Sequence, residues 1–423
     1  MSQKPLCSRI IQYMYLSNPL EKFTMLKICF LLMLSLNSFA LTFNEAVEIL
    51  SSHSSVESII GMSNSTKEVG ASKGSWGDPM FKVAAKNFPK DSLKRDETPM
   101  TGVEFGISQK ISLTNKYGVI EDSFRELSKS YEFEAGDLKR RLTRSLWEIL
   151  ILKRKTNEER EILKENLLWL EKILKVSKKL YVNGKTSQQA ILEIQIRKSE
   201  VEIQLNSREF ELLKIKNGLK YLLGEKFSRI KEGTIPWHIL NKENKESKDF
   251  KELSLQSKVQ AKDLALSAAN KDYIPDITFS LGYTKRSDID GRGDFVGASV
   301  SFPLPFSGDK YSKKGSAVFE KYTAKKEFEN YEKKKNRDSE ILKYEISKAE
   351  KDLFILNSKM IKFAKNSRAI TSKSYGLGNS SYLELLQSEL KLQNILILKS
   401  DLLSKRDSFK VALKYTLGEK LSE

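Results

Sequence analysis

Residues 181–187 read YVNGKTS and residues 375–381 read YGLGNSS, so the two segments match at an offset of 194 positions. At the same offset, without a gap, KYLLGEK at 220–226 matches KYTLGEK at 414–420. Two separate matches in one register indicate an internal duplication. Two copies are too few for an open repeat array, which usually needs three or more repeats. Each copy is therefore expected to supply half of one architecture.

The duplication sets the expected order of segments along the chain. We expect a first structural repeat at 41–224, a connector at 225–249 and a second structural repeat at 250–420. Each repeat should contain a helix, a strand pair, a very long helix, a tight turn and a shorter returning helix. The connector contains Gly233 and Pro236 followed by a polar run, which is typical of an irregular outer segment.

The longest segment of each repeat has the pattern of a helical rod. Residues 114–182 contain no proline, and one helix of that length would extend roughly 100 Å. The second long helix is expected at about 311–375. Apolar residues recur in both at steps of 4 and 3, the spacing of a coiled-coil seam. The seam residues are Leu163, Leu167, Leu170 and Leu174 in the first copy, and Leu342, Ile346, Ala349, Leu353, Leu356, Met360 and Phe363 in the second.

Turn and cap residues bound the helices. Each rod ends at the repeated turn, where Gly184 and Gly378 can take the left-handed conformation of a helix C-cap. Shorter returning helices are expected at about 186–223 and 380–417. Thr42 and Glu45 form a capping-box pattern at the start of a helix expected at 42–73.

Between the helices, four segments alternate apolar and polar residues with a period of two, which predicts strands. They form two pairs, at 81–86 with 103–108 and at 277–284 with 296–302. Each strand has one apolar face and one small or polar face. That pattern is typical of a membrane barrel strand, and also of a half-buried strand in a soluble sheet. The residues expected to face lipid in the first case are Val103, Phe105, Ile107, Phe279, Leu281, Tyr283 and Val300.

Four strands cannot close a barrel, and an open sheet edge is not tolerated in lipid. If these strands lie in a membrane, several chains must therefore combine them. Three chains would give twelve strands, a size within the known range of barrels.

The N-terminal segment has the pattern of a leader sequence. Residues 25–40, MLKICFLLMLSLNSFA, combine Lys27, an apolar run and a Ser-Phe-Ala cleavage pattern, so we expect a signal peptide cut after Ala40. The segment 1–40 is then an N-terminal extension and signal peptide, with either Met1 or Met25 as the start. A retained helical anchor is the alternative. Both cysteines, Cys7 and Cys29, lie in this segment, and no lipobox surrounds Cys29.

Charge and motif content argue against several classes of protein. Lys and Arg exceed Asp and Glu by 18, but lysines and glutamates are interleaved, as in a solvated helix face, so no nucleic-acid partner is expected. His53 and His238 have no partner at metal-ligand spacing, and no P-loop or dinucleotide fingerprint occurs. We therefore expect no metal site, no cofactor and no enzymatic activity.

The order of elements resembles the TolC family of outer-membrane efflux channels over residues 41–420. LTFNEAVEIL at 41–50 is similar to the family's opening helix, and Tyr375, Gly378 and Ser381 followed by Leu385-Leu386 are similar to its tip motif. GDP at 77–79, NFP at 87–89 and GVEFGISQKI at 102–111 resemble the first barrel hairpin of the heavy-metal (CzcC-like) branch.

The resemblance implies a mainly α-helical fold with a small β part and a homotrimer with a twelve-stranded outer-membrane barrel and a long periplasmic α-barrel. Such a trimer would be the exit duct of a tripartite efflux pump or type I secretion system. Its partners would be outer-membrane lipid, a periplasmic adaptor protein and an inner-membrane transporter, most simply of the RND type. Metal cations are the cargo that the first hairpin suggests. A periplasmic or surface coiled-coil scaffold without channel activity is the alternative.

The resemblance also implies a gate. The family's periplasmic tip is constricted by acidic residues six and nine positions after the second tip glycine, which here are Glu384 and Gln387. The equivalent residues of the first copy are Ala190 and Glu193. A ring of three carboxylates in a narrow lumen would attract cations. The alternative is that Glu384 is an ordinary solvated helix residue.

Overall fold

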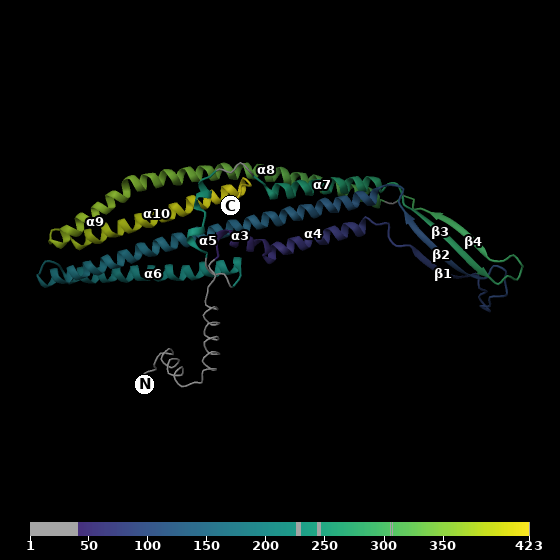
Figure 1. Ribbon diagram of the computed structural model, residues 1–423, viewed down its shortest axis with the longest axis horizontal. Coiled ribbons are helices and arrows are strands. Elements are labelled where there is room, and N and C mark those ends of the chain that lie inside the picture. The colour runs from purple at the N-terminus through teal and green to yellow at the C-terminus, as the bar shows by residue number, and fades with distance from the viewer. Residues whose placement is uncertain (1–40, 226–229, 243–246, 305, 307, 423) are drawn as a thin grey trace, which may run out of the picture.

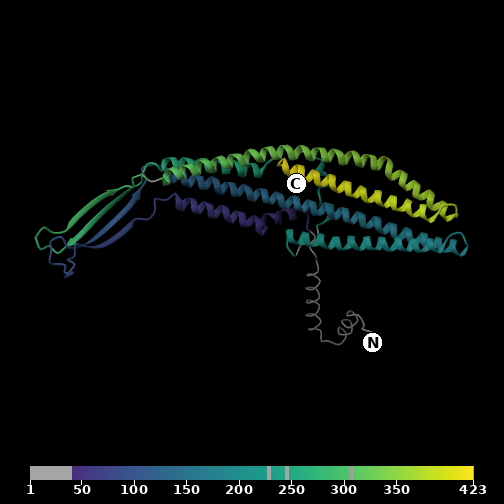
Figure 2. The same ribbon diagram turned by 180° about the vertical axis from the view of Figure 1, so that it is seen from behind.

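The computed structural model describes residues 41–225, 230–242, 247–304, 306 and 308–422. The expected leader at 1–40 lies outside the described residues. The described chain is an elongated rod of helices with a sheet of strands at one end (Figures 1 and 2). The predicted class, mainly α-helical with four strands, is confirmed.

The first half of the chain begins with the predicted capping box, because the Thr42 side chain accepts from Glu45 N–H and Glu45 accepts from Thr42 N–H. The expected single helix at 42–73 is interrupted, since His53 has an extended backbone with ψ 135° and its ring caps the following helix. The elements are α3 (Phe43–Ile49), the 3₁₀ helix η1 (Leu50–Ser52), α4 (Ser54–Lys73), β1 (Met80–Lys86), β2 (Gly102–Ile111), α5 (Lys116–Val182) and α6 (Gln188–Leu223).

The second half repeats this order after two short 3₁₀ helices in the connector. Its elements are η2 (Glu232–Thr234), η3 (Trp237–Asn241), α7 (Phe250–Lys271), β3 (Ile277–Arg286), β4 (Phe295–Ser301), α8 (Asp309–Ile355), the π-helical turn η4 (Leu356–Met360), α9 (Ile361–Gly376) and α10 (Tyr382–Thr416). A long helix followed by a returning helix therefore occurs twice, once uninterrupted and once with a π turn.

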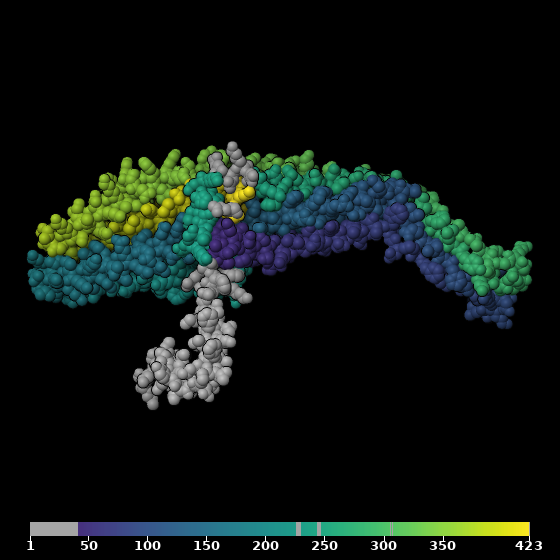
Figure 3. Space-filling view, in the orientation of Figure 1, coloured from purple at the N-terminus to yellow at the C-terminus, as the bar shows by residue number. Residues whose placement is uncertain are grey.

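Helix α5 is the centre of the rod. It packs against α4 and α6 on one side and against α7 and α10 on the other, while α8 packs against α7 and α10. As a result α4 and α6 run along one long edge of the molecule, and α8 and α9 run along the opposite edge (Figures 1 and 3).

A hydrophobic core at the middle of the rod ties together distant parts of the chain. Trp147 of α5 is fully buried and packs against Phe43 and Trp237, with ring centroids 4.9 and 5.4 Å away. Its indole N–H donates to the carbonyl of Leu421 at 2.8 Å. The opening helix, the connector and the C-terminal segment are thus fixed to one point of α5.

The first predicted seam is confirmed, since Leu163 and Leu170 are buried in a core at the far end of the rod and Leu167 and Leu174 pack against it. The second seam is wrong beyond Leu356. Met360 and Phe363 are 39% and 66% exposed, whereas Ala364 is buried and Ile361 packs against the core. The π turn η4 adds one residue to a helical turn, so every later position shifts by one. A prediction that continues the 4-3 spacing unchanged therefore places the later core positions one residue too early.

The four strands form one antiparallel sheet in the order β1-β2-β3-β4. Both hairpins are formed within a repeat, and β2 pairs with β3 between repeats over ten residues, from Gly102 opposite Arg286 to Ile111 opposite Ile277. Across the described segments, none of the helices combines the length and the apolar character needed to span a bilayer.

Candidate functional site

The sheet separates two chemically different faces. Alternation along the strands places polar and glycine residues on one face and large apolar residues on the other. The predicted lipid-facing residues all fall on the apolar face: Val103, Phe105, Ile107, Phe279, Leu281, Tyr283 and Val300. All of these except the half-buried Val103 are exposed, as are Phe81, Val83 and Val296 beside them.

The polar face contains a shallow hollow of about 360 Å³. Gly106, Gly282 and Gly297 lie opposite one another on β2, β3 and β4 and form its floor. A Cβ atom at Gly282 would lie 3.1 Å from Glu104 Oε1, so the absence of a side chain there lets the Glu104 carboxylate lie against the sheet. Ser108, Ser280, Ser299 and Thr284 add hydroxyl groups to the lining of the hollow, and Phe295 also lines it.

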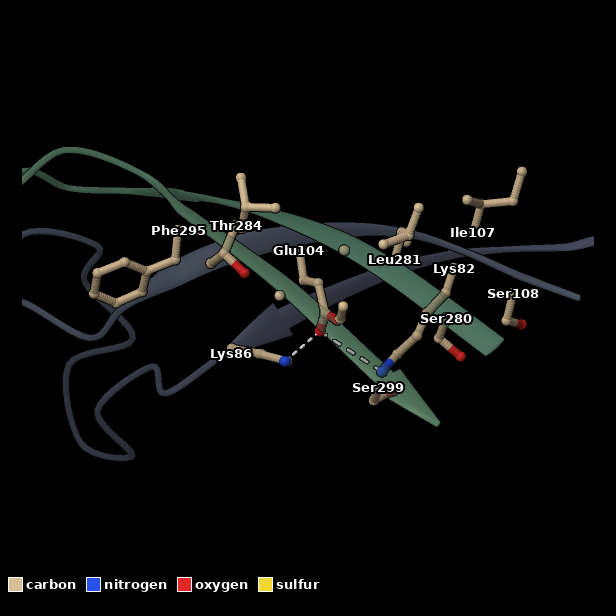
Figure 4. A pocket seen from close by; sticks show the side chains of 15 residues that line it. Lys82, Lys86, Glu104, Ile107, Ser108, Ser280, Leu281, Thr284, Phe295 and Ser299 are labelled. Carbon is tan, nitrogen blue, oxygen red and sulfur yellow. Dashed lines mark ion pairs between the residues drawn. The ribbon is translucent and has the colours of Figure 1, made fainter. Parts of the chain in front are cut away.

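Three charged side chains line one side of this hollow. Glu104 lies between Lys82 and Lys86 of β1 (Figure 4), with Lys82 Nζ 3.6 Å from Glu104 Oε2 and Lys86 in closer contact with the same oxygen. We call these residues the Lys82–Glu104–Lys86 cluster. It was not predicted, although the alternation of Lys82, Ala84 and Lys86 with apolar residues was a signal in the sequence.

A second ionic cluster joins the strands to the helices. Lys116 Nζ at the start of α5 contacts Asp276 Oδ1 at 2.9 Å and Asp272 Oδ1 at 2.7 Å, and Lys110 Nζ at the end of β2 contacts Asp276 Oδ2 at 3.0 Å. Burial alone would raise the pKa of Asp276, but hydrogen bonds from Lys116, Lys110 and Tyr117 outweigh it and lower this pKa to about 2. The carboxylate is therefore charged at neutral pH and holds the sheet against the rod.

The opposite end of the rod is a tip made of two adjacent turns. Gly184 and Gly378 have φ angles of 70° and 82°. A Cβ atom at Gly378 would lie 3.5 Å from Lys185 Cδ, so the two turns are neighbours. Ser177 Oγ and the Tyr375 hydroxyl are 2.8 Å apart and link the two helical hairpins just behind them.

The predicted gate residues lie on the returning helices near these turns. Glu384 is exposed, and its carboxylate accepts from Ser381 N–H in a capping box at the start of α10. Gln387 is exposed one turn later. On α6, Ala190 is buried and the half-buried Glu193 accepts a hydrogen bond from Gln189 at 2.9 Å. The structure thus gives Glu384 a local capping role, and its role as a gate remains a prediction.

Behind the tip, a buried polar layer crosses the helical core. Gln393 of α10 accepts from Asn166 of α5 and, at 2.7 Å, from Arg197 of α6. Glu389 is also buried, 3.4 Å from Arg368. Burial raises the pKa of Glu389, and the nearby Arg368 only partly opposes this. This layer was not predicted, although Glu389 and Gln393 are in helical phase with the buried Leu385 and Leu392.

The described residues contain no group of three or more His, Cys, Asp or Glu side chains placed to hold a metal ion. Around the hollow, the lysine side chains present ammonium groups and the serine side chains present hydroxyl groups.

No sequence-family model and no curated protein sequence matches the chain. Solved structures do match its fold. The outer membrane protein VceC of Vibrio cholerae matches with a TM-score of 0.74 at 14% identity, covering 90% of this chain and 97% of that chain. CusC, whose structures are described in terms of transmembrane channel formation, matches with a TM-score of 0.73 at 12% identity over 90% and 92% of the two chains.

The Campylobacter jejuni CmeC outer membrane channel matches with a TM-score of 0.70 at 14% identity, covering 90% of this chain and 87% of that chain. This chain has the TolC-like fold. The predicted fold class is therefore confirmed, and at such low identities the similarity concerns the fold alone. A heavy-metal branch is not distinguished by this similarity of fold, and that part of the resemblance remains a prediction.

Proposed function

We propose that this protein is the outer-membrane exit duct of a tripartite efflux pump or type I secretion system, assembled as a homotrimer whose helical rods extend into the periplasm. The observation that carries the proposal is the four-stranded sheet, which in the described structure is open at both edges and exposes large apolar side chains over most of one face. The similarity of the fold to solved outer-membrane channels supports the same conclusion.

The edges of the sheet fit a ring of three chains. In the described structure β1 and β4 each pair with one strand only. Because the four strands alternate in direction, β4 of one chain can pair antiparallel with β1 of the next. Three chains then give twelve strands and leave no open edge, which a sheet in lipid requires.

The apolar face fits lipid better than water. Ten large apolar side chains between Phe81 and Val300 are exposed on this one face. Monomeric soluble proteins rarely expose a continuous apolar patch of more than a few hundred Å². A water-soluble scaffold, the alternative function, would have to leave this whole surface uncovered.

The two long edges of the rod carry apolar stripes that fit a second copy of the chain. On α6 the exposed residues Ile196, Ile203 and Phe210 are seven positions apart. On the opposite edge Ile355, Phe363, Ile370 and Leu377 are exposed at steps of eight, seven and seven, and the step of eight spans the π turn. Heptad stripes of this kind bind a neighbouring helix. A ring in which α6 of one chain meets α8 and α9 of the next would cover both stripes.

The tip is then the place where a periplasmic adaptor and an inner-membrane transporter of the RND type would join the duct. The sequence contains no nucleotide-binding motif, so energy would come from the transporter. A constriction formed by Glu384, Gln387 and Glu193 and a cargo of metal cations both remain predictions of the sequence resemblance.

Purification from outer membranes tests the proposal. We expect the protein to require detergent, to have the mass of three chains, and to conduct ions when it is inserted into a planar lipid bilayer. A monomer that stays soluble without detergent and produces no conductance would support the scaffold instead.

A further inference from the structure

The polar face of the sheet carries an unbalanced charge. Lys82 and Lys86 share the one carboxylate of Glu104, which leaves one positive charge in excess. The other two basic side chains on this face are balanced by acidic groups: Lys110 and Lys116 share Asp276 and Asp272, and Arg286 pairs with Asp290. Lys110 contacts Asp276 at 3.0 Å and Arg286 contacts Asp290 at 2.9 Å. On the described strands, the excess therefore belongs to the Lys82–Glu104–Lys86 cluster.

The positive groups of this cluster are more accessible than the negative one. The side chains of Lys82 and Lys86 are 61% and 45% exposed, whereas that of Glu104 is 16% exposed. The carboxylate lies against the glycine floor of the hollow, while the lysine side chains extend from the edge strand beside it (Figure 4). A solute that enters the hollow therefore meets ammonium and hydroxyl groups.

We propose that this cluster forms an anion-attracting belt inside the barrel, an inference that rests on the proposed function. In a trimer the belt would contain six lysines and three glutamates around one lumen, with serine hydroxyls between them as hydrogen-bond donors. Rings of lysine side chains favour anions in pores. The duct then favours anionic solutes, such as small molecules with carboxylate or phosphate groups, over free cations. This is opposite in sign to the carboxylate ring predicted at the tip.

Ion selectivity of the reconstituted trimer tests the belt. In a KCl gradient across a planar bilayer, we expect the double substitution Lys82→Gln and Lys86→Gln to shift the reversal potential toward cation preference. Glu104→Gln should shift it the opposite way. Lys285→Gln is the control for each single lysine substitution, because it removes one positive charge per chain from the opposite face of the sheet. The shifts should grow as the salt concentration falls, because added salt screens charges at the surface of a pore.

A thiol placed in the hollow measures the local field directly. The sequence beyond residue 40 contains no cysteine, so Ser299→Cys supplies a single target in the processed chain. Negatively charged methanethiosulfonate should react there faster than its positively charged counterpart, after normalisation to a free thiol. Lys86→Gln should lower this ratio by roughly twofold at 0.1 M salt.

The outcomes separate this inference from the proposed function. A trimer that conducts, but whose reversal potential and labelling ratio are the same with and without the two lysines, would overturn the belt and leave the duct intact. Failure to form any trimer or conductance would count against the duct itself. Opposite shifts for the lysine and glutamate substitutions, with little effect of Lys285→Gln, would establish the belt.

Discussion

The sheet and the helical rod both expose large apolar side chains, but they expose them in different patterns. On the sheet, Phe105, Ile107, Phe279 and Leu281 belong to a continuous face several strands wide. On the rod, Ile203 and Phe210 belong to a narrow stripe whose members are seven residues apart along α6. A broad face needs a fluid apolar surrounding, whereas a heptad stripe needs a matching helix. The pattern of exposure thus distinguishes a lipid partner from a protein partner.

The largest effect is expected from a charge on the broad face. Phe105→Lys or Phe279→Lys should prevent assembly in the outer membrane, because a lysine at the bilayer midplane costs about 2–4 kcal/mol in each chain. Trimers in outer-membrane fractions, detected on gels without heating, measure this. Ser280→Lys, on the polar face of the same strand as Phe279, is the control and should assemble. If Phe279→Lys and Ser280→Lys formed trimers equally well, the two faces of the sheet would lie in the same surroundings.

A charge on a narrow stripe should have the next largest effect. Phe210→Asp should weaken association of the chains while each chain stays helical, because burial of a phenylalanine side chain contributes about 1.5–3 kcal/mol. Native mass spectrometry in detergent would report the fraction of trimer. Lys216→Asp, at an exposed site on another face of the same helix, introduces the same side chain and should leave the trimer intact. If Phe210→Asp also leaves the trimer intact, α6 does not form an interface between chains.

The stability of the junction between the sheet and the rod should depend on pH. The pKa of Asp276 is lowered in the folded state to about 2, so its contribution to stability is complete above the ordinary carboxyl pKa and is lost as pH falls through 2. Asp276→Asn should lower the melting temperature at pH 7 and reduce the further loss on acidification. Asp122→Asn, at an exposed site on α5, should leave both unchanged. Identical acid profiles for Asp276→Asn and the unaltered protein would contradict the assignment.

A smaller effect is expected where the π turn sets the helix phase. Ala364 is buried against the core formed by Leu356 and Leu392, so Ala364→Leu should overpack it and destabilise the protein by about 1–3 kcal/mol. Lys365→Leu introduces the same side chain at the exposed neighbour and should be nearly neutral. Thermal unfolding followed by circular dichroism measures both. If the 4-3 spacing continued unshifted, Phe363 would occupy this place in the core and Ala364→Leu would be nearly neutral.

The smallest effect is expected at the tip. Glu384→Ala removes a capping-box partner, which costs about 1 kcal/mol locally, and should also change conductance or cation block if Glu384 is a gate. Glu384→Gln separates the two roles, since glutamine can still cap but carries no charge. Unaltered conductance in both variants would remove Glu384 from the gating mechanism.

Much of the fold could be predicted from the sequence because it depends on local patterns. The capping box at Thr42 and the first seam through Leu163 and Leu170 follow directly from residue spacing. The phase shift at Leu356 could not be predicted, because a π turn depends on how α8 packs against α10 and has no fixed sequence signal. The break at His53 was missed for a similar reason, since a histidine that caps a helix looks like any polar helix residue.

Less of the candidate site than of the fold could be predicted from the sequence. Alternation predicted which strand residues share the apolar face, but it did not show that Glu104 would lie between two lysines, because that requires the pairing of β1 with β2. Similarly, the buried Glu389 contacts Arg368 on the preceding helix, and Gln393 accepts from Asn166 on a helix that is distant in sequence. Such partners are fixed by tertiary register, which residue spacing within one element does not contain.

Cross-linking of the sheet edges tests most directly the central claim that chains combine their strands. Within one chain Val83 of β1 and Val296 of β4 share a row and are separated by two intervening strands, or roughly 14 Å, too far for a disulfide. A panel of cysteine pairs that combines Phe81 or Val83 with Val296, Ala298 or Val300 should therefore cross-link only between chains. We predict covalent trimers for at least one pair and none for either cysteine alone. No cross-link across the whole panel, or dimers from a single cysteine, would contradict the account.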